Sequence, residues 1–161
     1  MSFGLAVRSL FWVALFPGVV AGYVPWRFFG LREARWDHLG PAQIVGLAGL
    51  TAGVLLELAC VWEFAHTGRG TLSVVDPPRE LVVRGLYRYV RNPMYLSVSL
   101  ILLGEALAIG SKALLGYWLV FFLLANAFVI GYEEPNLRER FGESYERYVR
   151  SVGRWIPRVP T

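Results

Sequence analysis

The chain has 161 residues, of which 55% are hydrophobic and only 17% are charged, and its mean hydropathy is +0.45. A soluble domain normally carries about 25% charged residues, so the composition predicts one membrane-embedded domain. Cys60 has no second cysteine to pair with, and His38 and His66 lack the spacing of a metal site. The net charge of +4 is modest, and we expect no metal and no nucleic-acid partner.

Four apolar runs are candidates for membrane-spanning helices. They cover residues 9–26, 39–56, 92–104 and 113–132. A span needs about 20 mostly apolar residues. The fourth run meets this length outright, and the second and third reach it if they continue through Glu57 and Glu105. The first contains Pro17, which predicts a kinked span, and we favour a span over a signal peptide because no Ala-x-Ala cleavage site follows.

The basic residues predict the orientation of these spans. If both termini are cytoplasmic, twelve of the sixteen Lys and Arg residues lie on the cytoplasmic side, as the positive-inside rule requires. We therefore expect an all-α membrane bundle of about four transmembrane helices with a cytoplasmic C-terminal amphipathic helix. Its single domain, residues 1–161, would hold two spans in residues 1–66 and a polar loop, two spans and the C-terminal helix in residues 67–161.

A polar segment precedes the third run and ends in a helix-start signal. Residues 67–91 are too polar to span a membrane, and Asn92-Pro93 follows them. Asn is a favoured N-cap and Pro suits the first helical position. The positive end of the helix dipole there would suit a carboxylate or phosphate. The alternative is that Asn92 merely caps its own helix.

A second polar segment follows the fourth run. Pro135 disfavours helical geometry at Glu134, so the fourth span is expected to end there and a new helix to begin at Pro135. Apolar side chains then recur on one face of that helix, which predicts an amphipathic helix on the membrane surface; they are Leu137, Phe141, Tyr145, Tyr148, Val149 and Val152. Neighbouring Glu133 and Glu134 cannot share a helix face. One would face a cation or sugar hydroxyl and the other an arginine, or both are solvated.

Glu57 and Glu105 lie within or near the ends of the second and third spans. A carboxylate inside a membrane is a functional candidate by default. Either residue would line a polar headgroup pocket or attract a cationic substrate. The alternative is a protonated, hydrogen-bonded structural role, and the sequence leaves both open.

The two polar segments together resemble a known family of membrane enzymes. The ordered set is Gly85-x-Tyr87, Arg91-Asn92-Pro93-x-Tyr95, Glu133-Glu134-x-x-Leu137, Phe141-Gly142-x-x-Tyr145 and Arg154-Trp155-Ile156-Pro157. This set is similar to the integral membrane methyltransferases that include isoprenylcysteine carboxyl methyltransferases and phospholipid N-methyltransferases. The likeness covers roughly residues 67–157. The resemblance implies S-adenosyl-L-methionine as cofactor, surrounding membrane lipids, and a lipid-like or prenylated small molecule as methyl acceptor.

The resemblance also implies roles for individual residues. The cofactor would be bound by Leu81, Val82, Gly85, Tyr87, Asn92, Pro93, Met94, Tyr95 and Glu133. For the reaction itself, we expect Arg91 or a carboxylate to orient the acceptor, and Glu134 or a glutamate within the membrane to take the proton of an amine acceptor. All of these residues would then lie on the cytoplasmic side.

Two positions depart from the carboxyl methyltransferase pattern. Asn92 stands where that branch usually has histidine, and Val129 stands where it has an arginine about one turn before the acidic pair. Asn92-Pro93-Met94-Tyr95 is closer to the phospholipid branch, whereas the match from Phe141 to Pro157 points to the carboxyl branch. The Gly-x-Gly of that branch has two candidate counterparts, Gly68-Arg69-Gly70 in the loop and Gly49 with Gly53 in the second span. The sequence leaves the acceptor and the oligomeric state open.

Two other functions compete with a methyltransferase. Membrane sterol reductases share a similar Tyr/Arg/Pro/Tyr segment and use a nicotinamide cofactor, but this chain is short for them and has no Gly-x-Gly-x-x-Gly. The second is a bundle without enzymatic activity, whose basic tail binds anionic lipid. Binding of S-adenosylhomocysteine, of reduced nicotinamide dinucleotide phosphate or of neither would distinguish the three.

Overall fold

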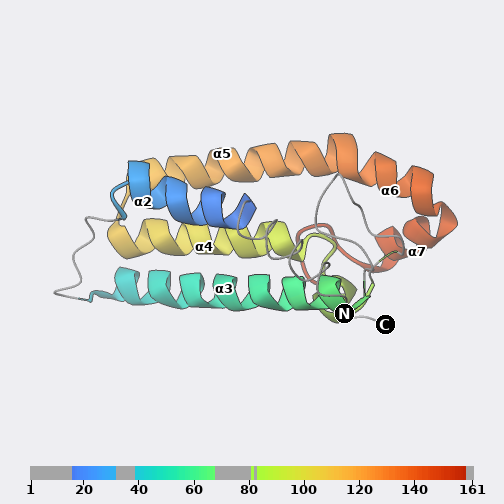
Figure 1. The fold of residues 1–161 in the computed structure, drawn as a ribbon, viewed down its shortest axis with the longest axis horizontal. Helices are drawn as coiled ribbons and strands as arrows, with labels where there is room; N and C mark the ends of the chain where they lie inside the picture. Colours follow the sequence, from blue (N-terminus) through green and yellow to red (C-terminus); the bar gives the residue numbers. More distant parts are fainter. Residues whose placement is uncertain (1–15, 32–38, 68–80, 82, 159–161) are drawn as a thin grey trace.

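The computed structural model describes residues 16–31, 39–67, 81 and 83–158, and within these ranges the fold is helical with no β-strand. The elements, labelled in Figure 1 where there is room, are η1 (Val19–Tyr23), α2 (Val24–Phe28), α3 (Pro41–Thr67), η3 (Gly85–Arg88), α4 (Pro93–Ile109), α5 (Lys112–Phe128), η4 (Val129–Glu133), α6 (Glu134–Phe141) and α7 (Glu143–Ser151). Segments η1 and η4 are π-helical and η3 is a 3₁₀-helix. The predicted all-α class is thus confirmed for this part of the chain.

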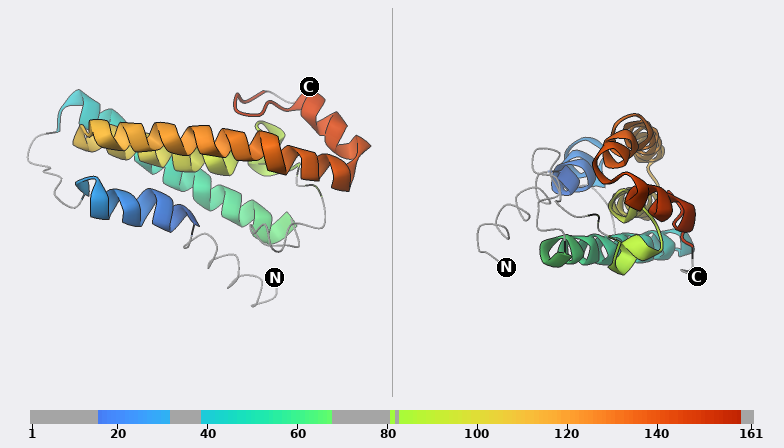
Figure 2. Two further views of the ribbon diagram at one scale, coloured as in Figure 1. Left: turned by 90° about the horizontal axis from the view of Figure 1, so that it is seen from above. Right: turned by 90° about the vertical axis from the view of Figure 1, so that its right-hand side faces the viewer.

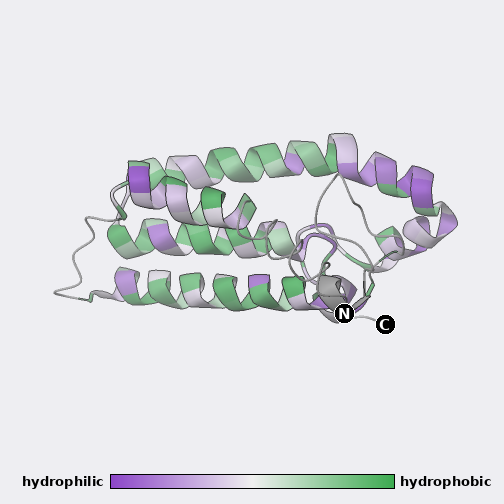
Figure 3. Ribbon diagram, viewed as in Figure 1, coloured by the Kyte–Doolittle hydropathy of each residue, from purple (hydrophilic) through white to green (hydrophobic). Residues whose placement is uncertain are grey.

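Three long helices, α3, α4 and α5, lie side by side and alternate in direction (Figure 1). Segment η4 and α6 extend α5 at the end of the bundle where α4 begins, and α7 folds back there (Figure 2). We call this end the polar end, because hydrophilic residues gather along α6 and α7 whereas the three long helices are mostly hydrophobic (Figure 3).

Two helical segments are long and apolar enough to cross a membrane. They are Pro41–Glu63 within α3 and Lys112–Phe141, which runs from α5 into α6. The helix Pro93–Ile109 is apolar but shorter. The described structure therefore supports two of the four predicted spans by length and composition, and a span at residues 9–26 and one at α4 remain predictions.

Glycines let α3 and α4 pack closely. A Cβ added to Gly46 would lie 2.5 Å from the backbone N of Ala108, and one added to Gly53 would lie 2.8 Å from that of Ile101. On the facing helix, a Cβ at Gly104 would lie 2.5 Å from the backbone N of Leu50. Small residues at such contacts allow the backbones to approach, which is a common mode of helix association in membranes. These glycines fix how α3 lies against α4.

The turn from α4 to α5 follows from two local signals. Gly110 ends α4 in the left-handed conformation, with φ at 66°, which glycine adopts at no steric cost. Ser111 then caps α5 by accepting a hydrogen bond from the backbone N of Leu114 at 3.2 Å. The core between these helices and η1 is apolar, and its buried residues are Ala21, Val98, Ile101, Leu102, Ala106 and Leu114.

The expected helix end at Glu134 is not found. The helix continues from α5 through η4 into α6, with Glu134 in the right-handed helical conformation. A π-helical turn carries an extra residue, and here the N–H of Glu134 bonds to the carbonyl of Val129, five residues earlier. Pro135 follows at the first turn of α6, where its missing N–H is tolerated. The π-helical turn therefore absorbs the proline without a break.

The amphipathic helix expected from Pro135 onward is in fact two helices. Gly142, with φ at 49°, separates α6 from α7. The predicted apolar residues still gather in one cluster because the chain folds back; Tyr145, Tyr148 and Val152 form its buried part, and Leu81, Leu137, Phe141 and Val149 pack against it. The apolar face of α7 is therefore covered by the protein itself.

Candidate functional site

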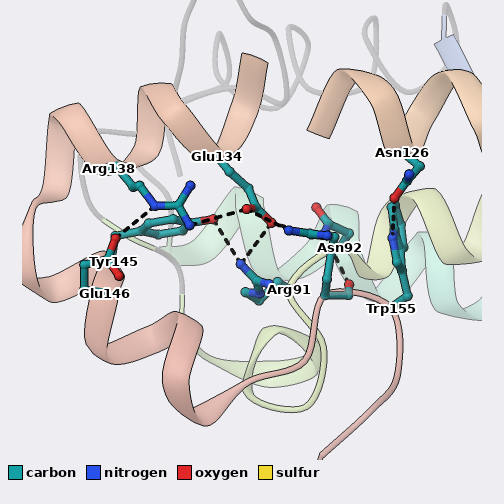
Figure 4. A network of polar contacts seen from close by, with 9 residues as sticks. Arg91, Asn92, Asn126, Glu134, Arg138, Tyr145, Glu146 and Trp155 are labelled. Carbon is teal, nitrogen blue, oxygen red and sulfur yellow. Dashed lines mark hydrogen bonds and ion pairs between the residues drawn. The ribbon is translucent and has the colours of Figure 1, made fainter. Parts of the chain in front are cut away.

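The carboxylate of Glu134 is the centre of an ion-pair cluster at the polar end (Figure 4). Arg154 donates to it twice, from Nε to Oε1 at 2.6 Å and from Nη2 to Oε2 at 3.0 Å. Arg91 Nη1 donates to Oε1 at 3.0 Å, and Arg138 Nη2 lies 3.6 Å from Oε2. Burial of a single charge is costly unless it is paired and hydrogen-bonded, and these arginines supply the pairing. The prediction that one member of the acidic pair meets an arginine is confirmed for Glu134.

Arg91 is held in this cluster by its backbone and its side chain. Its N–H donates to the carbonyl of Gly153 at 2.9 Å, beside the isolated parallel bridge between Val90 and Gly153. Its Nη1 also lies 3.4 Å from the hydroxyl of Tyr145. The Nε of Arg91, however, is buried and has no hydrogen-bond partner among the described residues. A buried donor without an acceptor is costly, so this N–H is suited to an acceptor on a ligand.

Asn92 occupies the predicted N-cap position of α4, with Pro93 as the first helical residue. Its side chain does not cap the helix. The amide Nδ2 instead donates to the carbonyl of Arg154 at 3.2 Å, and Arg158 N donates to the carbonyl of Tyr89 at 2.8 Å. These bonds join the C-terminal segment to the start of α4. The first turn of α4 is left without a side-chain cap, which leaves N–H groups suited to an anion.

Glu133 differs from its neighbour in its surroundings. Its Oε1 accepts a hydrogen bond from the hydroxyl of Tyr95 at 3.0 Å, and it makes no ion pair among the described residues. Tyr95 lies on the first turn of α4, so this bond links the acidic pair to the predicted Asn92–Tyr95 segment. The structure thus brings both predicted segments together at one end of the bundle.

The remaining predicted cofactor residues lie around the start of α4. Tyr87 is buried in η3, and its carbonyl accepts a hydrogen bond from the hydroxyl of Tyr148 at 2.7 Å. Gly85 has φ at 54°, a left-handed conformation that favours glycine. A Cβ there would lie 2.6 Å from Oε2 of Glu63, a contact that the flexible Glu63 side chain can relieve by moving. Met94 accepts a hydrogen bond from Ser97 at its carbonyl. Leu81 packs against the buried cluster of Tyr145, Tyr148 and Val152, and Val82 lies outside the described residues.

Trp155 forms an aromatic side of the site that the sequence analysis did not single out. Its Nε1 donates to Oδ1 of Asn126 on α5 at 2.9 Å (Figure 4). Its ring lies edge-on to Tyr95, with centroids 6.3 Å apart, and 5.3 Å from Phe122. Trp155 was visible in the sequence only as part of the C-terminal match, because nothing local signals a contact with α5.

The electrostatics of the polar end favour charged arginine and neutral tyrosine. The hydrogen bond to Glu134 raises the pKa of Arg154. Burial raises the pKa of the Tyr145 hydroxyl, and burial likewise raises the pKa of Tyr148. The phenols are therefore neutral hydrogen-bond donors at physiological pH. None of these tyrosines is poised to take up a proton.

Two further buried carboxyl groups lie along the bundle. Glu57 on α3 accepts a hydrogen bond from the hydroxyl of Ser97 on α4. One oxygen of Glu57 and one of Glu105 are buried without a partner among the described residues.

Val129, which stands where the carboxyl methyltransferase pattern has an arginine, is buried in η4. In the described part of the chain, no group of three or more His, Cys, Asp or Glu side chains is placed to hold a metal ion.

Comparisons with known proteins bear on this site. The chain matches the family model described as phospholipid methyltransferase over residues 41–144. It is 47% identical over 64 residues to an uncharacterized protein of Haemophilus influenzae, a stretch that covers 39% of this chain and 100% of that protein. It is 37% identical over 86 residues to protein-S-isoprenylcysteine O-methyltransferase of Schizosaccharomyces pombe, which covers 50% of this chain and 34% of that enzyme. No solved structure matches.

The family model covers well over half of the chain, and its match includes both polar segments as far as Ser144. This confirms the resemblance that the ordered motifs carry. The elements matched run from α3 to the start of α7, and Arg154 and Trp155 of the polar end lie beyond the match. The chain belongs to the phospholipid methyltransferase family.

Proposed function

We propose that the chain is an integral membrane methyltransferase that uses S-adenosyl-L-methionine and methylates a lipid-like or prenylated small acceptor. The family match supports the class of reaction. One observation carries the location of the site: Glu134 is saturated by arginines, whereas Glu133 beside it accepts a single hydrogen bond, from Tyr95. Glu133 therefore retains lone pairs for a ligand.

The residues of the polar end fit the chemical groups of this cofactor. The Glu133 carboxylate suits its ribose hydroxyls or its amino group, and Tyr95 and Trp155 offer aromatic surface beside that carboxylate. The N–H groups in the uncapped first turn of α4 suit its carboxylate. The buried Nε–H of Arg91 is a further donor without an acceptor among the described residues.

The chain's contribution to the reaction would be position and exclusion of water. When bound, S-adenosyl-L-methionine supplies an electrophilic methyl group, whose bond to sulfur breaks as the bond to the acceptor forms. The aromatic groups of Tyr95, Phe122 and Trp155 keep the region apolar on one side. The helices would hold donor and acceptor in line, which accelerates transfer by removing the cost of their encounter.

Glu134 fits a positioning role better than the role of a proton acceptor. Arg91 and Arg154 donate to both of its oxygens, and a carboxylate paired in this way is a poor base. It holds these two arginines, and through them the start of α4 and the C-terminal segment. We therefore do not assign proton transfer from an amine acceptor to Glu134.

We further propose that the site and both termini face the cytoplasm and that α4 and residues 9–26 complete a bundle of four spans. The distribution of basic residues supports this orientation. Arg84, Arg88 and Arg91 precede α4 at the polar end. At the opposite end, where α4 turns into α5, the basic residue is Lys112, the first residue of α5. A cytoplasmic site would have access to a nucleotide-derived cofactor.

The cofactor assignment is tested by binding of S-adenosylhomocysteine, measured by calorimetry on the purified protein in detergent. Glu133→Gln removes the charge and keeps the shape, and it should raise Kd by roughly 10- to 100-fold, as expected for hydrogen bonds to a charged group of about 1.5–3 kcal/mol. Glu139→Gln is the matched control, because Glu139 is an exposed glutamate on α6, six residues after Glu133. It should leave Kd unchanged.

Equal affinity of wild type and Glu133→Gln would reject Glu133 as a cofactor residue. Binding of reduced nicotinamide dinucleotide phosphate in place of S-adenosylhomocysteine would reject the methyltransferase assignment. The acceptor is then identified by transfer of a radiolabelled methyl group to phospholipid amines, prenylcysteines and small thiols. The double variant Glu133→Ala, Asn92→Ala should lose this transfer.

A further inference from the structure

Helix α4 carries a buried carboxyl group away from the polar end. Glu105 lies twelve residues after Pro93, or about 18 Å along the helix at 1.5 Å per residue. It is 4% exposed, and its Oε2 is buried with no hydrogen-bond partner among the described residues. A carboxyl group in an apolar environment without a partner is costly and usually has a function. No part of the proposed methyl transfer uses it.

Glu105 lines a groove between η1, α3 and α4. The groove has a volume of about 360 Å³ and is open to the surface, within the range of roughly 300–1,000 Å³ typical of small-molecule sites. Its lining residues include Pro17, Ala21, Leu50, Val54, Ile101 and Glu105. Glu105 is the one polar side chain that lines the groove in the described structure. The groove thus combines an apolar wall with a single hydrogen-bonding group.

The η1 wall of the groove is held in place by α5. The hydroxyl of Tyr117 donates to the carbonyl of Val20 at 3.0 Å, and its ring lies 5.0 Å from that of Phe29. Helix α3 forms the opposite wall and is fixed against α4 by the glycine contacts described above. The groove therefore lies between helices with defined positions and is preformed for a ligand.

We propose that this groove binds a long-chain alcohol, with its chain along the apolar wall and its hydroxyl group on the carboxyl group of Glu105. A purely apolar molecule would leave the carboxyl without a partner. An amine would form an ion pair, whose two desolvated charges are costly in an apolar site. A hydroxyl both donates and accepts a hydrogen bond and carries no charge. The proposal uses the membrane location, and it is independent of the methyl-transfer assignment.

The proposal is tested by photolabelling in phosphatidylcholine nanodiscs with a diazirine-bearing dodecanol and with its methyl ether. The two probes share one chain, and only the alcohol has a hydrogen to donate. After irradiation, labelled peptides are mapped by mass spectrometry. We expect the alcohol to label α3 around Leu50 and Val54 roughly fivefold more than the ether, the ratio that one neutral hydrogen bond confers.

Substitution of Glu105 sharpens this test. Glu105→Leu should remove the preference for the alcohol, whereas Glu105→Gln should retain it because an amide donates and accepts. Circular dichroism and gel-filtration elution check that each variant is folded, and the comparison of the two probes on wild-type protein needs no variant. Equal labelling by alcohol and ether, or an unchanged preference in Glu105→Leu, would overturn the proposal, as would preferential labelling by a dodecylamine probe.

Discussion

The polar end and the opposite half of α4 both bury a carboxyl group, but they surround it differently. Glu134 is 3% exposed and Glu105 is 4% exposed, so their burial is nearly the same. Arg91 and Arg154 hydrogen-bond to Glu134, whereas one oxygen of Glu105 has no partner in the described part of the chain and its groove neighbours are apolar. Burial alone therefore does not define the role of a carboxyl group, and the groups around it do.

Glu57 lies between these extremes. It is 5% exposed, one oxygen accepts a hydrogen bond from Ser97, and the other has no partner among the described residues. From Glu134 through Glu57 to Glu105, the number of hydrogen bonds that the described residues give to the carboxyl group falls from several to none that the described structure shows. We read the first as a structural centre and the last as a ligand group. The comparison predicts that substitutions at the polar end cost the most stability.

The largest expected effect is that of Glu134→Gln. The variant leaves Arg91 and Arg154 charged and without their carboxylate, and removing one partner of a buried ion pair costs about 3–5 kcal/mol. The free energy of unfolding in detergent, followed by tryptophan fluorescence, measures this loss. Glu143→Gln is the control, because Glu143 is 96% exposed in its pair with Arg147, and it should have little effect. Similar losses for both variants would contradict the comparison.

A smaller loss is expected from Gly104→Val in the half of α4 away from the polar end. The new Cβ would lie 2.5 Å from the backbone N of Leu50 and 2.7 Å from the carbonyl of Gly46. Separating α3 from α4 should cost about 1–3 kcal/mol, as overpacking does. Gly116→Ala on α5 is the control, since a Cβ there meets nothing within 4 Å. If thermal unfolding of Gly104→Val matched that of the control, close packing would not hold the apolar half together.

The smallest effect should come from Trp155→Phe, which keeps an aromatic ring at the polar end and removes one hydrogen bond. Loss of the bond to Asn126 should lower the free energy of unfolding by about 1 kcal/mol. Trp26→Phe is the comparison variant, because Trp26 is exposed on α2. An effect of Trp155→Phe as large as that of Glu134→Gln would show that the aromatic contacts, and not the ion pairs, dominate this end.

Local sequence signals predicted the features that depend on neighbouring residues. Asn92-Pro93 marks the start of α4, and the apolar runs correspond to α3, α4 and α5. The adjacency of Glu133 and Glu134 on a helix left two possibilities open, a solvated acidic pair or one glutamate paired with an arginine. The structure shows the arginine pairing for Glu134. The helix break at Pro135 was wrong, because the π-helical turn η4 accommodates the proline. No local sequence signal indicates that the backbone hydrogen bonds in η4 join residues five apart, as in a π-helix, and not four apart, as in an α-helix.

Contacts between distant segments were beyond the sequence signals. Arg154 reaches Glu134, and Asn92 bonds to the carbonyl of Arg154 instead of capping its own helix. Trp155, in the C-terminal segment, donates a hydrogen bond to Asn126 on α5. Each of these depends on the fold-back at Gly142, which brings the C-terminal segment beside the start of α4. The spacing of residues along one helix therefore cannot predict which residues Arg154, Asn92 and Trp155 contact.

The amino-acid sequence by itself determined the helical class, the apolar helical segments and the family, because hydrophobic periods and short motifs are properties of nearby residues. Tertiary structure decided which buried carboxyl group is paired. An ion pair requires atoms within about 4 Å, and only folding sets that distance between Glu134 and Arg91 or leaves Glu105 facing an apolar groove. The same residue type thus acquires different chemistry from its place in the bundle.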